Sequence, residues 1–376
     1  MIAPSEAPPV VEQGPPAAAA SPPPEPLAEV TFVITNYNGR EVLDGTLTAL
    51  DDLGVAPSHI VLSDDGSTDG SPAWVAARYP AARVVMMPRN SRRLNAVRNR
   101  GLRQARTRYV FLMDNDIVVL PGCIAELMRV MHSRPGILCC TPRLLDATDT
   151  DRIYQDGATL HYLGLSANQA RGAAASYRPP GDPVPTFGGG IMLIDRDLAG
   201  DIGLFDEGYA LGWADDGELQ LRGRIAGYEA LHVPTARCLH HERERGRSRA
   251  YGQFYNRYRL MLCCYAASTL LLLAPALLAF ELALTAAAFA TRVPGDRFRA
   301  LRDIWRDRVH WLRRRRSVQR RRRVSDAELL GGGALQLPGV LQADSAVARI
   351  ARGAGRLVDL YWITARAVLR LLHGDR

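Results

Sequence analysis

The stretch Val110-Phe-Leu-Met-Asp-Asn-Asp-Ile-Val-Val119 places four apolar residues before Asp114-Asn115-Asp116 and three after them. A short apolar run of this kind predicts a buried strand, in which residues i and i+2 share a face, so both carboxylates can reach one ligand. Buried carboxylates are costly unless a positive group compensates them, and a divalent cation holding a phosphate would do so. A strand that ends in a solvated acidic turn explains the stretch equally well, so the rest of the chain has to decide.

Upstream of this stretch, short apolar strands alternate with polar loops and helices. Strands are predicted at 30–34, 59–62 and 83–87, and helices follow each of them. This alternation predicts an open α/β sheet, whose ligands bind at the carboxyl ends of the strands. Three polar clusters fall at such ends, which favours a nucleotide site over three independent surface turns. The clusters are Thr35–Gly39, Asp64–Asp69 and Asp114–Asp116.

Downstream, residues 141–186 are polar and rich in turn residues, and we expect short strands and loops that line a groove. The glycine run 188–190 either lets the backbone approach a ligand or forms a tight structural turn. Asp215 and Asp216 open a predicted helix, where the macrodipole stabilises acids whether or not they have a function. His240 leaves a predicted strand beside these carboxylates, and is either structural or a metal ligand.

Composition and charge set broader bounds. The 376 residues are 47% hydrophobic, enough for one large domain or two ordinary ones, and the formal net charge is +8. The basic residues are all Arg and concentrate after residue 236, which suggests a local anionic partner such as a lipid surface. The six Cys lack metal or disulfide spacing and are expected to be reduced and buried. Residues 1–27 are Pro/Ala-rich without signal-peptide features, and are predicted to be a disordered tail.

The segment 251–330 is predicted to associate with a membrane. Residues 260–290 are nearly all apolar, and their length alone would allow a transmembrane helix. Arg257 and Arg259 precede the run and further Arg follow it, so both ends are expected to stay cytoplasmic. We therefore expect a re-entrant or interfacial hairpin bent near Pro275, with the buried core of a helical domain as the alternative.

Two Arg blocks, at 313–316 and 320–323, first suggest nucleic acid. Beside an apolar hairpin, anionic lipid headgroups are the better partner, so we expect a membrane contact through 260–323 and no nucleic acid. Residues 331–346 are predicted to be a linker. The segment 347–376 is predicted to be an amphipathic helix that lies on the membrane through 347–372, or that forms a homodimer.

Taken in order, the motifs resemble those of glycosyltransferase family 2 over about 28–330. Enzymes of that family have the GT-A fold, a Rossmann-like open mixed sheet flanked by helices, and transfer sugars from nucleotide-diphosphate donors with inversion. The resemblance implies an α/β GT-A catalytic domain over 28–250, followed by the membrane-associated helical region. The matching motifs are Asn36-Tyr-Asn-Gly39, Asp64-Asp-Gly-Ser-Thr-Asp-Gly-Ser71, Arg98-Asn-Arg-Gly101, Asp114-Asn-Asp116, Gly188-Gly-Gly190, Phe205-Asp-Glu207, Asp215-Asp216 and Val233-Pro-Thr-Ala-Arg-Cys-Leu-His240.

The resemblance also implies roles for individual residues. Asp216 would be the catalytic base and Asp215 its partner. Asp116, Asp114 and His240 would bind the divalent metal, Mn²⁺ or Mg²⁺. The nucleotide would contact Thr35, Asn36, Asp64, Asp65, Arg98, Asn99 and Asp114, and the donor and acceptor pocket would include Gly189, Gly190 and Trp213. The chain departs from the family pattern at 90–95, so Arg92 and Arg93 either hold the diphosphate or are solvated helix charges.

These residues predict an inverting glycosyltransferase at the cytoplasmic face of the plasma membrane. A metal would neutralise the leaving diphosphate, and a carboxylate base would activate the acceptor hydroxyl. The donor is expected to be a UDP- or dTDP-sugar, and the acceptor a lipid-linked or cell-envelope glycan. One alternative is a nucleotidyltransferase. That class would require a Gly-rich loop with Lys or Arg after the first strand, and residues 35–39 are not such a loop. The other is a non-catalytic scaffold that keeps the fold and binds membranes.

Overall fold

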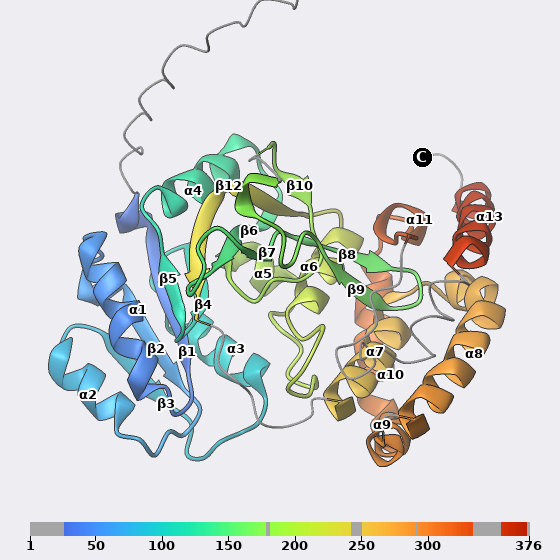
Figure 1. The fold of residues 1–376 in the computed structure, drawn as a ribbon, viewed down its shortest axis with the longest axis horizontal. Helices are drawn as coiled ribbons and strands as arrows, with labels where there is room; N and C mark the ends of the chain where they lie inside the picture. The colour runs from blue at the N-terminus through green and yellow to red at the C-terminus, as the bar shows by residue number, and fades with distance from the viewer. Residues whose placement is uncertain (1–25, 178–180, 242–249, 291, 334–354, 374–376) are drawn as a thin grey trace, which may run out of the picture.

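The computed structural model describes residues 26–177, 181–241, 250–290, 292–333 and 355–373. Most of the predicted tail (1–27) and of the predicted linker (331–346) lies outside these ranges. Within them the chain forms a sheet domain followed by a helical region, as Figure 1 shows from blue to red. The two are joined by a continuous core, because residues of both pack in one cluster of buried side chains.

The sheet has ten strands, of which eight follow the order β10-β12-β6-β11-β4-β1-β2-β3, while β5 pairs with β12 and β7 with β6. Strands β1 to β4 run parallel, whereas β11 is antiparallel to both of its neighbours, so the sheet is mixed. The predicted open α/β sheet is therefore confirmed. Its strands are β1 (Val30–Asn36), β2 (Ile60–Asp64), β3 (Arg83–Met86), β4 (Tyr109–Asp114), β5 (Ile117–Val119), β6 (Ile137–Asp146), β7 (Ile153–Gln155), β10 (Val184–Pro185), β11 (Met192–Asp195) and β12 (Glu229–His240), with a separate hairpin of β8 (Ala158–His161) and β9 (Leu165–Asn168).

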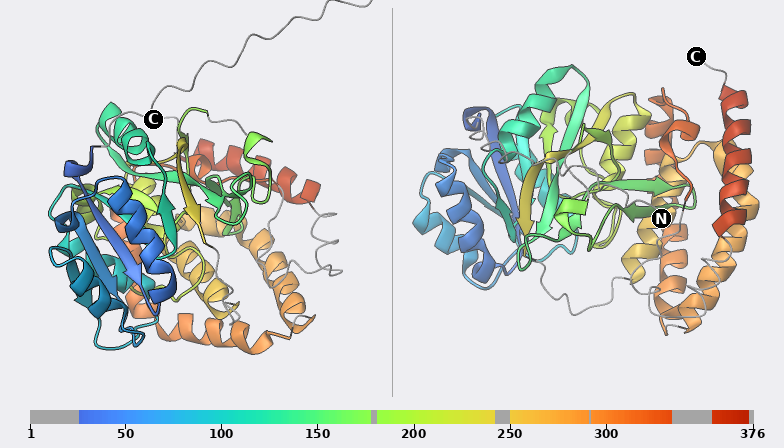
Figure 2. Two further views of the ribbon diagram at one scale, coloured as in Figure 1. Left: turned by 60° about the vertical axis from the view of Figure 1, so that its left-hand side comes forward. Right: turned by 45° about the horizontal axis from the view of Figure 1, so that its top comes forward.

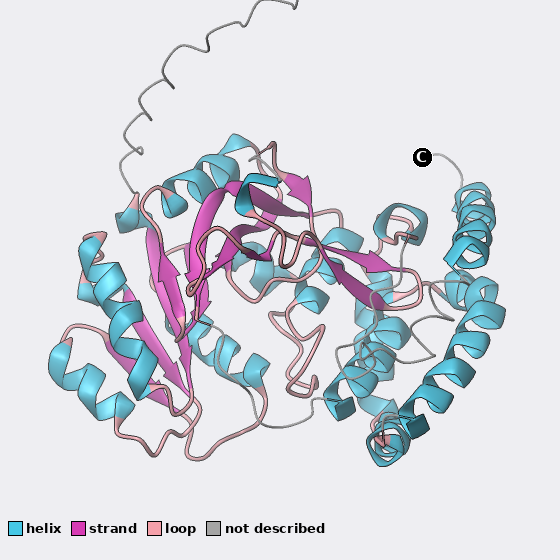
Figure 3. Ribbon diagram, in the orientation of Figure 1, coloured by secondary structure: helices cyan, strands magenta, loops and turns pink. Residues whose placement is uncertain are grey.

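Helices cover both faces of this sheet and make three layers, visible as cyan on either side of magenta in Figure 3. Helices α1 (Arg40–Asp52), α2 (Ser71–Arg78) and α4 (Cys123–Ser133) contribute to one core cluster. Helices α3 (Leu94–Gln104) and α5 (Arg196–Asp201) contribute to the other, whereas α6 (Gly217–Ile225) is divided between it and the cluster shared with the helical region. The apolar runs of the strands thus pack on both faces, as expected for parallel strands covered by helices.

The opening stretch is not one strand, contrary to the prediction. Strand β4 ends at Asp114, and the chain turns before β5, which leaves β4 and pairs antiparallel with β12. Two hydrogen bonds of Asn115 fix this turn. Its side-chain amide donates to Asn36 Oδ1 at 2.6 Å, and its backbone carbonyl accepts from Thr46 Oγ1 at 2.8 Å. The i, i+2 rule of a strand therefore does not place the two acids. Asp114 stays in register with Thr35, whereas Asp116 turns toward His240.

The helical region packs against the sheet domain on the side away from β1–β3, as two further views show (Figure 2). Helix α7 is the buried link, with twelve of its fifteen residues in the interior. The region consists of α7 (Ala250–Cys264), α8 (Ala267–Ala290), α9 (Pro294–Arg306), α10 (Arg308–Arg320), α11 (Asp326–Leu329) and α13 (Gly355–His373).

The predicted hairpin bent at Pro275 is wrong. Helix α8 continues through Pro275, and the bend falls at Tyr265 and Ala266, between α7 and α8. That turn is held from outside the apolar run, because Asp326 accepts from the Ala266 amide at 2.7 Å and Arg315 donates to the Tyr265 carbonyl at 2.8 Å. The first part of the run belongs to a buried core helix, which was the alternative prediction. Only α8 remains as a helix long and apolar enough to cross a membrane among the described residues.

Three of the Arg residues that flank the apolar run are not free charges. Arg257 is buried in an ion pair with Glu281. Arg259 is buried in ion pairs with Asp206 and Asp307. Arg297, which follows α8, is also buried and pairs with Glu281. These three side chains therefore do not add positive charge to the surface on either side of the run.

The two Arg blocks divide in the same way. Arg314, Arg315 and Arg322 are partly buried and donate to backbone carbonyls or pair with acids of the protein. Their polar contacts are thus already used inside the helical region. The more exposed members, which are Arg313, Arg316, Arg320, Arg321 and Arg323, remain as surface charge.

Candidate active site

The polar residues predicted at the strand ends meet at one edge of the sheet. The register aligns Asn36 with Asp64 and Thr35 with Asp114. The Thr35 hydroxyl donates to Asp114 Oδ1 at 2.7 Å, and the Asn36 amide donates to Asp64 Oδ2 at 2.7 Å. Three loops that are far apart in the sequence therefore form one polar surface, as the sequence predicted.

Asp64 and Asp65 differ in their surroundings. Asp64 is fully buried, and both of its oxygens accept hydrogen bonds from within the protein, including those of the Ser67 amide and hydroxyl. Asp65 accepts from the Ser91 amide at 2.8 Å and so joins the loop that carries Arg92 and Arg93 to the β2 end. Asp64 thus organises its loop, while Arg92 and Arg93 are exposed beside it.

Asp116 and His240 form the candidate metal position. Because β5 pairs with β12, His240 Nε2 comes within 3.8 Å of Asp116 Oδ1, and both side chains are buried. This distance exceeds a hydrogen bond, and two ligands bound at about 2.0–2.2 Å to one cation can be this far apart. The pair therefore fits a divalent ion as two of its ligands. Among the described residues no group of three or more His, Cys, Asp or Glu forms a fuller set.

Asp216 is held at the start of α6 by two backbone amides. It is the N-cap residue, and its carboxylate accepts from Gly217 N at 2.8 Å and from Gly189 N at 2.8 Å. Gly189 has φ of +110°, which favours glycine, and a Cβ at Gly190 would lie 2.8 Å from Arg98 Nη2. The glycine run thus serves close approach of the backbone to this acidic pair.

The neighbouring Asp215 makes a buried ion pair with Arg98 at 3.0 Å. Burial raises the pKa of Asp215 to about 6, with smaller increases from the charges of Asp216 and Asp114, while Arg98 acts in the opposite direction. Because the charge of Asp114 acts on Asp215, the end of β4 lies near the start of α6. Three predicted parts of the site, namely Arg98, Asp114 and the pair Asp215–Asp216, therefore lie close together.

Asn99 is used differently from the prediction that it contacts the nucleotide. Its amide donates to the Phe205 carbonyl and to Glu207, and its oxygen accepts from the Phe205 amide. All of these contacts go to the segment before the acidic pair. The side chain is buried, and its hydrogen bonds position the protein's own loop.

Two buried Asn that the sequence did not single out hold the same loop, residues 205–216. Asn95 donates to the carbonyls of Asp206 and Asp215, at 3.0 and 2.8 Å. Asn256 of α7 donates to the carbonyls of Ala210 and Trp213, at 2.9 and 2.7 Å. Nothing in the local sequence of Asn256 signals this role, because its partners lie more than forty residues away.

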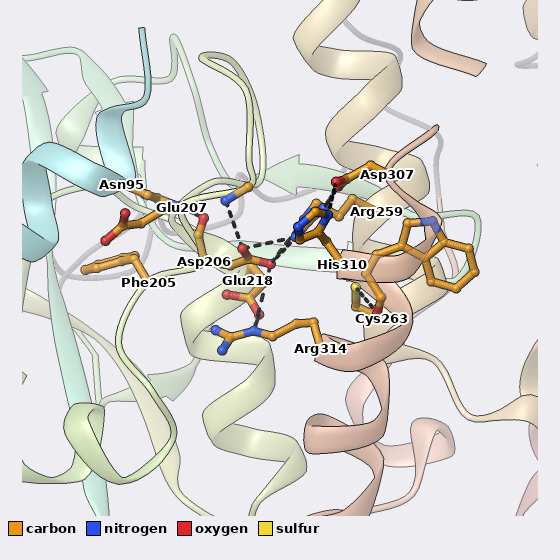
Figure 4. Close-up of polar contacts among 12 residues, drawn as sticks. Asn95, Phe205, Asp206, Glu207, Glu218, Arg259, Cys263, Asp307, His310 and Arg314 are labelled. Atoms are coloured by element: carbon orange, nitrogen blue, oxygen red, sulfur yellow. Dashed lines mark hydrogen bonds and ion pairs between the residues drawn. The ribbon is translucent and has the colours of Figure 1, made fainter. Parts of the chain in front are cut away.

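An ionic network ties the loop to the helical region (Figure 4). Arg259 Nε donates to Asp206 Oδ2 at 3.1 Å, and its Nη1 pairs with Asp307. Arg314 Nε lies 3.8 Å from Asp206 and 3.9 Å from Glu218, which itself pairs with Arg222. Helices α6, α7 and α10 therefore meet at the loop that carries the acidic pair.

A groove of about 970 Å³ runs beside Asp216. One wall is formed by the sheet domain, including Gly189 and Trp213, and the other by α7 and α8. Trp213 lies near Phe187, with ring centroids 6.2 Å apart. As predicted, residues of the 141–186 segment line this groove, among them Tyr154, Gln155, Ser166, Asn168 and Arg171.

The fold is that of the GT-A glycosyltransferases, and the comparisons identify the chain as a glycosyltransferase. The crystal structure of GalNAc-T7 with UDP, GalNAc and Mn²⁺ matches with a TM-score of 0.52 at 19% identity, over 64% of this chain and 48% of that one. At this identity the likeness shows the fold alone. Residues 31–203 match Glycosyl transferase family 2, so the chain carries a domain of that family.

Curated relatives agree with this assignment. The N-acetylglucosaminyl-diphospho-decaprenol L-rhamnosyltransferase of Mycobacterium tuberculosis is 26% identical over 234 residues, covering 56% of this chain and 75% of that protein. The poly-beta-1,6-N-acetyl-D-glucosamine synthase of Staphylococcus aureus is 24% identical over 221 residues, covering 56% of this chain and 50% of the relative. The resemblance found in the sequence is thus confirmed at the level of family and fold.

Proposed function

We propose that this chain is an inverting glycosyltransferase that moves a sugar from a nucleotide-diphosphate donor to a hydroxyl of a lipid-linked or cell-envelope glycan. The observation that carries the proposal is the position of Asp216. Its carboxylate lines the groove and is fixed by two backbone amides, and the charge of Asp114 at the end of β4 acts on the neighbouring Asp215. The names of the relatives support an acceptor from the cell envelope.

In this proposal Asp216 removes the proton of the acceptor hydroxyl as it attacks the anomeric carbon of the donor. Gly189 N and Gly217 N orient the carboxylate, and the Arg98–Asp215 pair excludes water from its buried side. Asp116 and His240 would hold a divalent ion, which would neutralise the charge that develops on the leaving diphosphate. One base and one displacement give inversion.

The nucleotide is proposed to lie over the ends of β1, β2 and β4. Thr35, Asp65 and Asp114 border this surface, while the buried Asn36 and Asp64 shape it from within. A UDP- or dTDP-sugar is the proposed donor. Arg92 and Arg93 are exposed beside Asp65, and Arg93 Nη1 also donates to the Glu207 carbonyl at 3.0 Å.

A position at the cytoplasmic face of the membrane is part of the proposal. Leu271, Leu278, Leu282 and Phe289 of α8 are 79%, 64%, 65% and 58% exposed, and their spacing places them on one helix face. Helices α9 and α13 carry comparable exposed residues, namely Phe298, Trp305, Leu360, Ile363 and Leu371. Exposed apolar side chains on these helices support a membrane contact. A homodimer through α13 stays a prediction.

Calorimetric titration of the full chain with UDP, in the presence and absence of Mn²⁺, tests the donor and metal assignments. We expect Mn²⁺ to tighten UDP binding in the wild type but not in Asp116→Asn. Asp201→Asn, a matched change at an exposed carboxylate of α5, should behave as the wild type. UDP-, dTDP- and GDP-sugars are then compared for hydrolysis and for transfer to polyprenyl-linked glycans. Absence of nucleotide binding and of transfer under all these conditions would contradict the proposal.

A further inference from the structure

The groove beside Asp216 is bounded on its helical side by Phe254, Arg257 and Leu284. Leu284 belongs to α8, the helix whose other face is exposed and apolar. The cavity therefore extends from the candidate base to the inner side of the helix that is proposed to meet the membrane. The helical wall carries two polar side chains, Gln253 and Arg257, and Arg257 is the charged one.

Arg257 is a buried cation with an unused donor. Its side chain is 2% exposed, Nε donates to the Leu163 carbonyl at 2.8 Å, and Nη1 pairs with Glu281. Its Nη2 is buried and has no hydrogen-bond partner among the described residues. An unsatisfied donor of a buried charged group is costly, so a site that leaves one beside a cavity is suited to a ligand acceptor.

The local charge balance points the same way. Glu281 pairs with both Arg257 and Arg297, at 2.6 Å for the latter, and all three side chains are mostly withdrawn from water. Two guanidinium groups therefore share one carboxylate, which leaves an excess positive charge at this wall. A buried excess charge is stabilised by a counter-ion, and guanidinium groups form their strongest hydrogen bonds with carboxylate or phosphate oxygens.

We propose that this groove is the acceptor site and that the guanidinium group of Arg257, which lines it, binds a phosphate or diphosphate group of the acceptor. This inference rests on the proposed glycosyl transfer and adds the anion contact. The acceptor sugar would lie against Phe187 and Trp213 with its hydroxyl at Asp216. Beyond the phosphate, an apolar chain would leave past Leu284 along α8.

The test compares two acceptors with the same sugar and the same chain length, one linked through a diphosphate and one an uncharged alkyl glycoside. The full chain is assayed in detergent as wild type, as the double variant Arg257→Gln/Glu281→Gln, which removes both members of the pair, and as Arg129→Gln. Arg129 is an exposed arginine of α4 that also pairs with a glutamate. We expect the wild type to prefer the diphosphate acceptor, and the double variant to lose about ten- to a hundredfold of that preference, mainly through KM. Arg129→Gln should keep it.

A second variant, Arg257→Lys, covers the case in which the double variant fails to fold. It keeps a cation opposite Glu281 but lacks the guanidinium fork, so the same loss of preference is expected. Equal kcat/KM of the wild type for both acceptors, or an unchanged preference in folded variants, would overturn the inference.

Inorganic phosphate added with the uncharged acceptor separates the two sources of the anion. Stimulation to the level of the diphosphate acceptor would identify free phosphate as the ligand and overturn the assignment to the acceptor. Absence of stimulation supports it. Failure of the wild type to transfer sugar to either acceptor would count against the proposed function instead, and is thereby distinguished from failure of the anion contact.

Discussion

Two buried arginines hold the 205–216 loop from different helices, and their partners differ. Arg259 of α7 is saturated, because its nitrogens all bind Asp206, Asp307 or the Tyr255 hydroxyl. Arg98 of α3 binds Asp215 and Asn95 through Nη1, but its buried Nε has no hydrogen-bond partner among the described residues. The fully bonded Arg259 is suited to hold structure, and the incompletely bonded Arg98 lies at the proposed reaction site.

The largest effect should come from Asp216, on the Arg98 side of this comparison. We expect Asp216→Asn to lower kcat by about a thousandfold, because a general base contributes on the order of 10²–10⁴. UDP binding, measured by calorimetry, should stay close to that of the wild type. Turnover at the wild-type rate would show that Asp216 is not the base.

The next effect concerns stability rather than catalysis. Arg259→Gln leaves Asp206 buried without its main cation and should lower the free energy of unfolding by about 3–5 kcal/mol. Arg129→Gln, at an exposed pair, should change it by less than about 1 kcal/mol. Urea unfolding measures both variants. A small loss for Arg259→Gln would break the distinction between the two arginines.

A smaller effect should appear in the pH dependence. Asp215 is ionised above its pKa of about 6, so the ion pair with Arg98 is present there and is lost as the pH falls through that value. We expect kcat/KM to fall about tenfold below pH 6 in the wild type. In Asp215→Asn the activity should be lower throughout, and this acid limb should disappear. A limb that persists unchanged in the variant would assign it to another group.

The smallest effect should fall on the outer face of α8, far from both arginines. Leu278→Ser and Leu282→Ser together should weaken binding to anionic lipid vesicles about tenfold, because each removes apolar area from the proposed contact. The midpoint of urea unfolding should hardly move, since both side chains are exposed. Sedimentation with vesicles measures binding, and unchanged partitioning would argue against α8 as a contact.

The sequence predicted the sheet and the meeting of its acidic loops because both follow from local patterns. The periodicity of the strands and their order in the chain predict an open sheet. The positions of Asp64, Asp114 and Asp116 after two of these strands predict a ligand site at the strand ends. The break at Asn115 was not predictable, because it depends on hydrogen bonds with Asn36 and Thr46 from another part of the chain.

The helical region was predicted less well for a similar reason. Arg257, Arg259 and Arg297 look like flanking charges in the sequence, and only the packing of α7, α8 and α9 shows that they pair internally. Pro275 suggested a bend, yet the helix continues through it while the turn lies ten residues earlier. The burial of these arginines and the position of the turn depend on contacts between residues far apart in the chain. The local sequence pattern does not reveal such contacts.

The groove wall contributed by Leu284 has a consequence for how substrate is found. If α8 rests in a lipid leaflet, an acceptor anchored in the same leaflet reaches Asp216 by lateral diffusion in two dimensions. The rate of encounter then depends on the surface density of acceptor in the membrane rather than on its bulk concentration. Diluting the acceptor with inert lipid should therefore slow transfer even when the total amounts of enzyme and acceptor are constant.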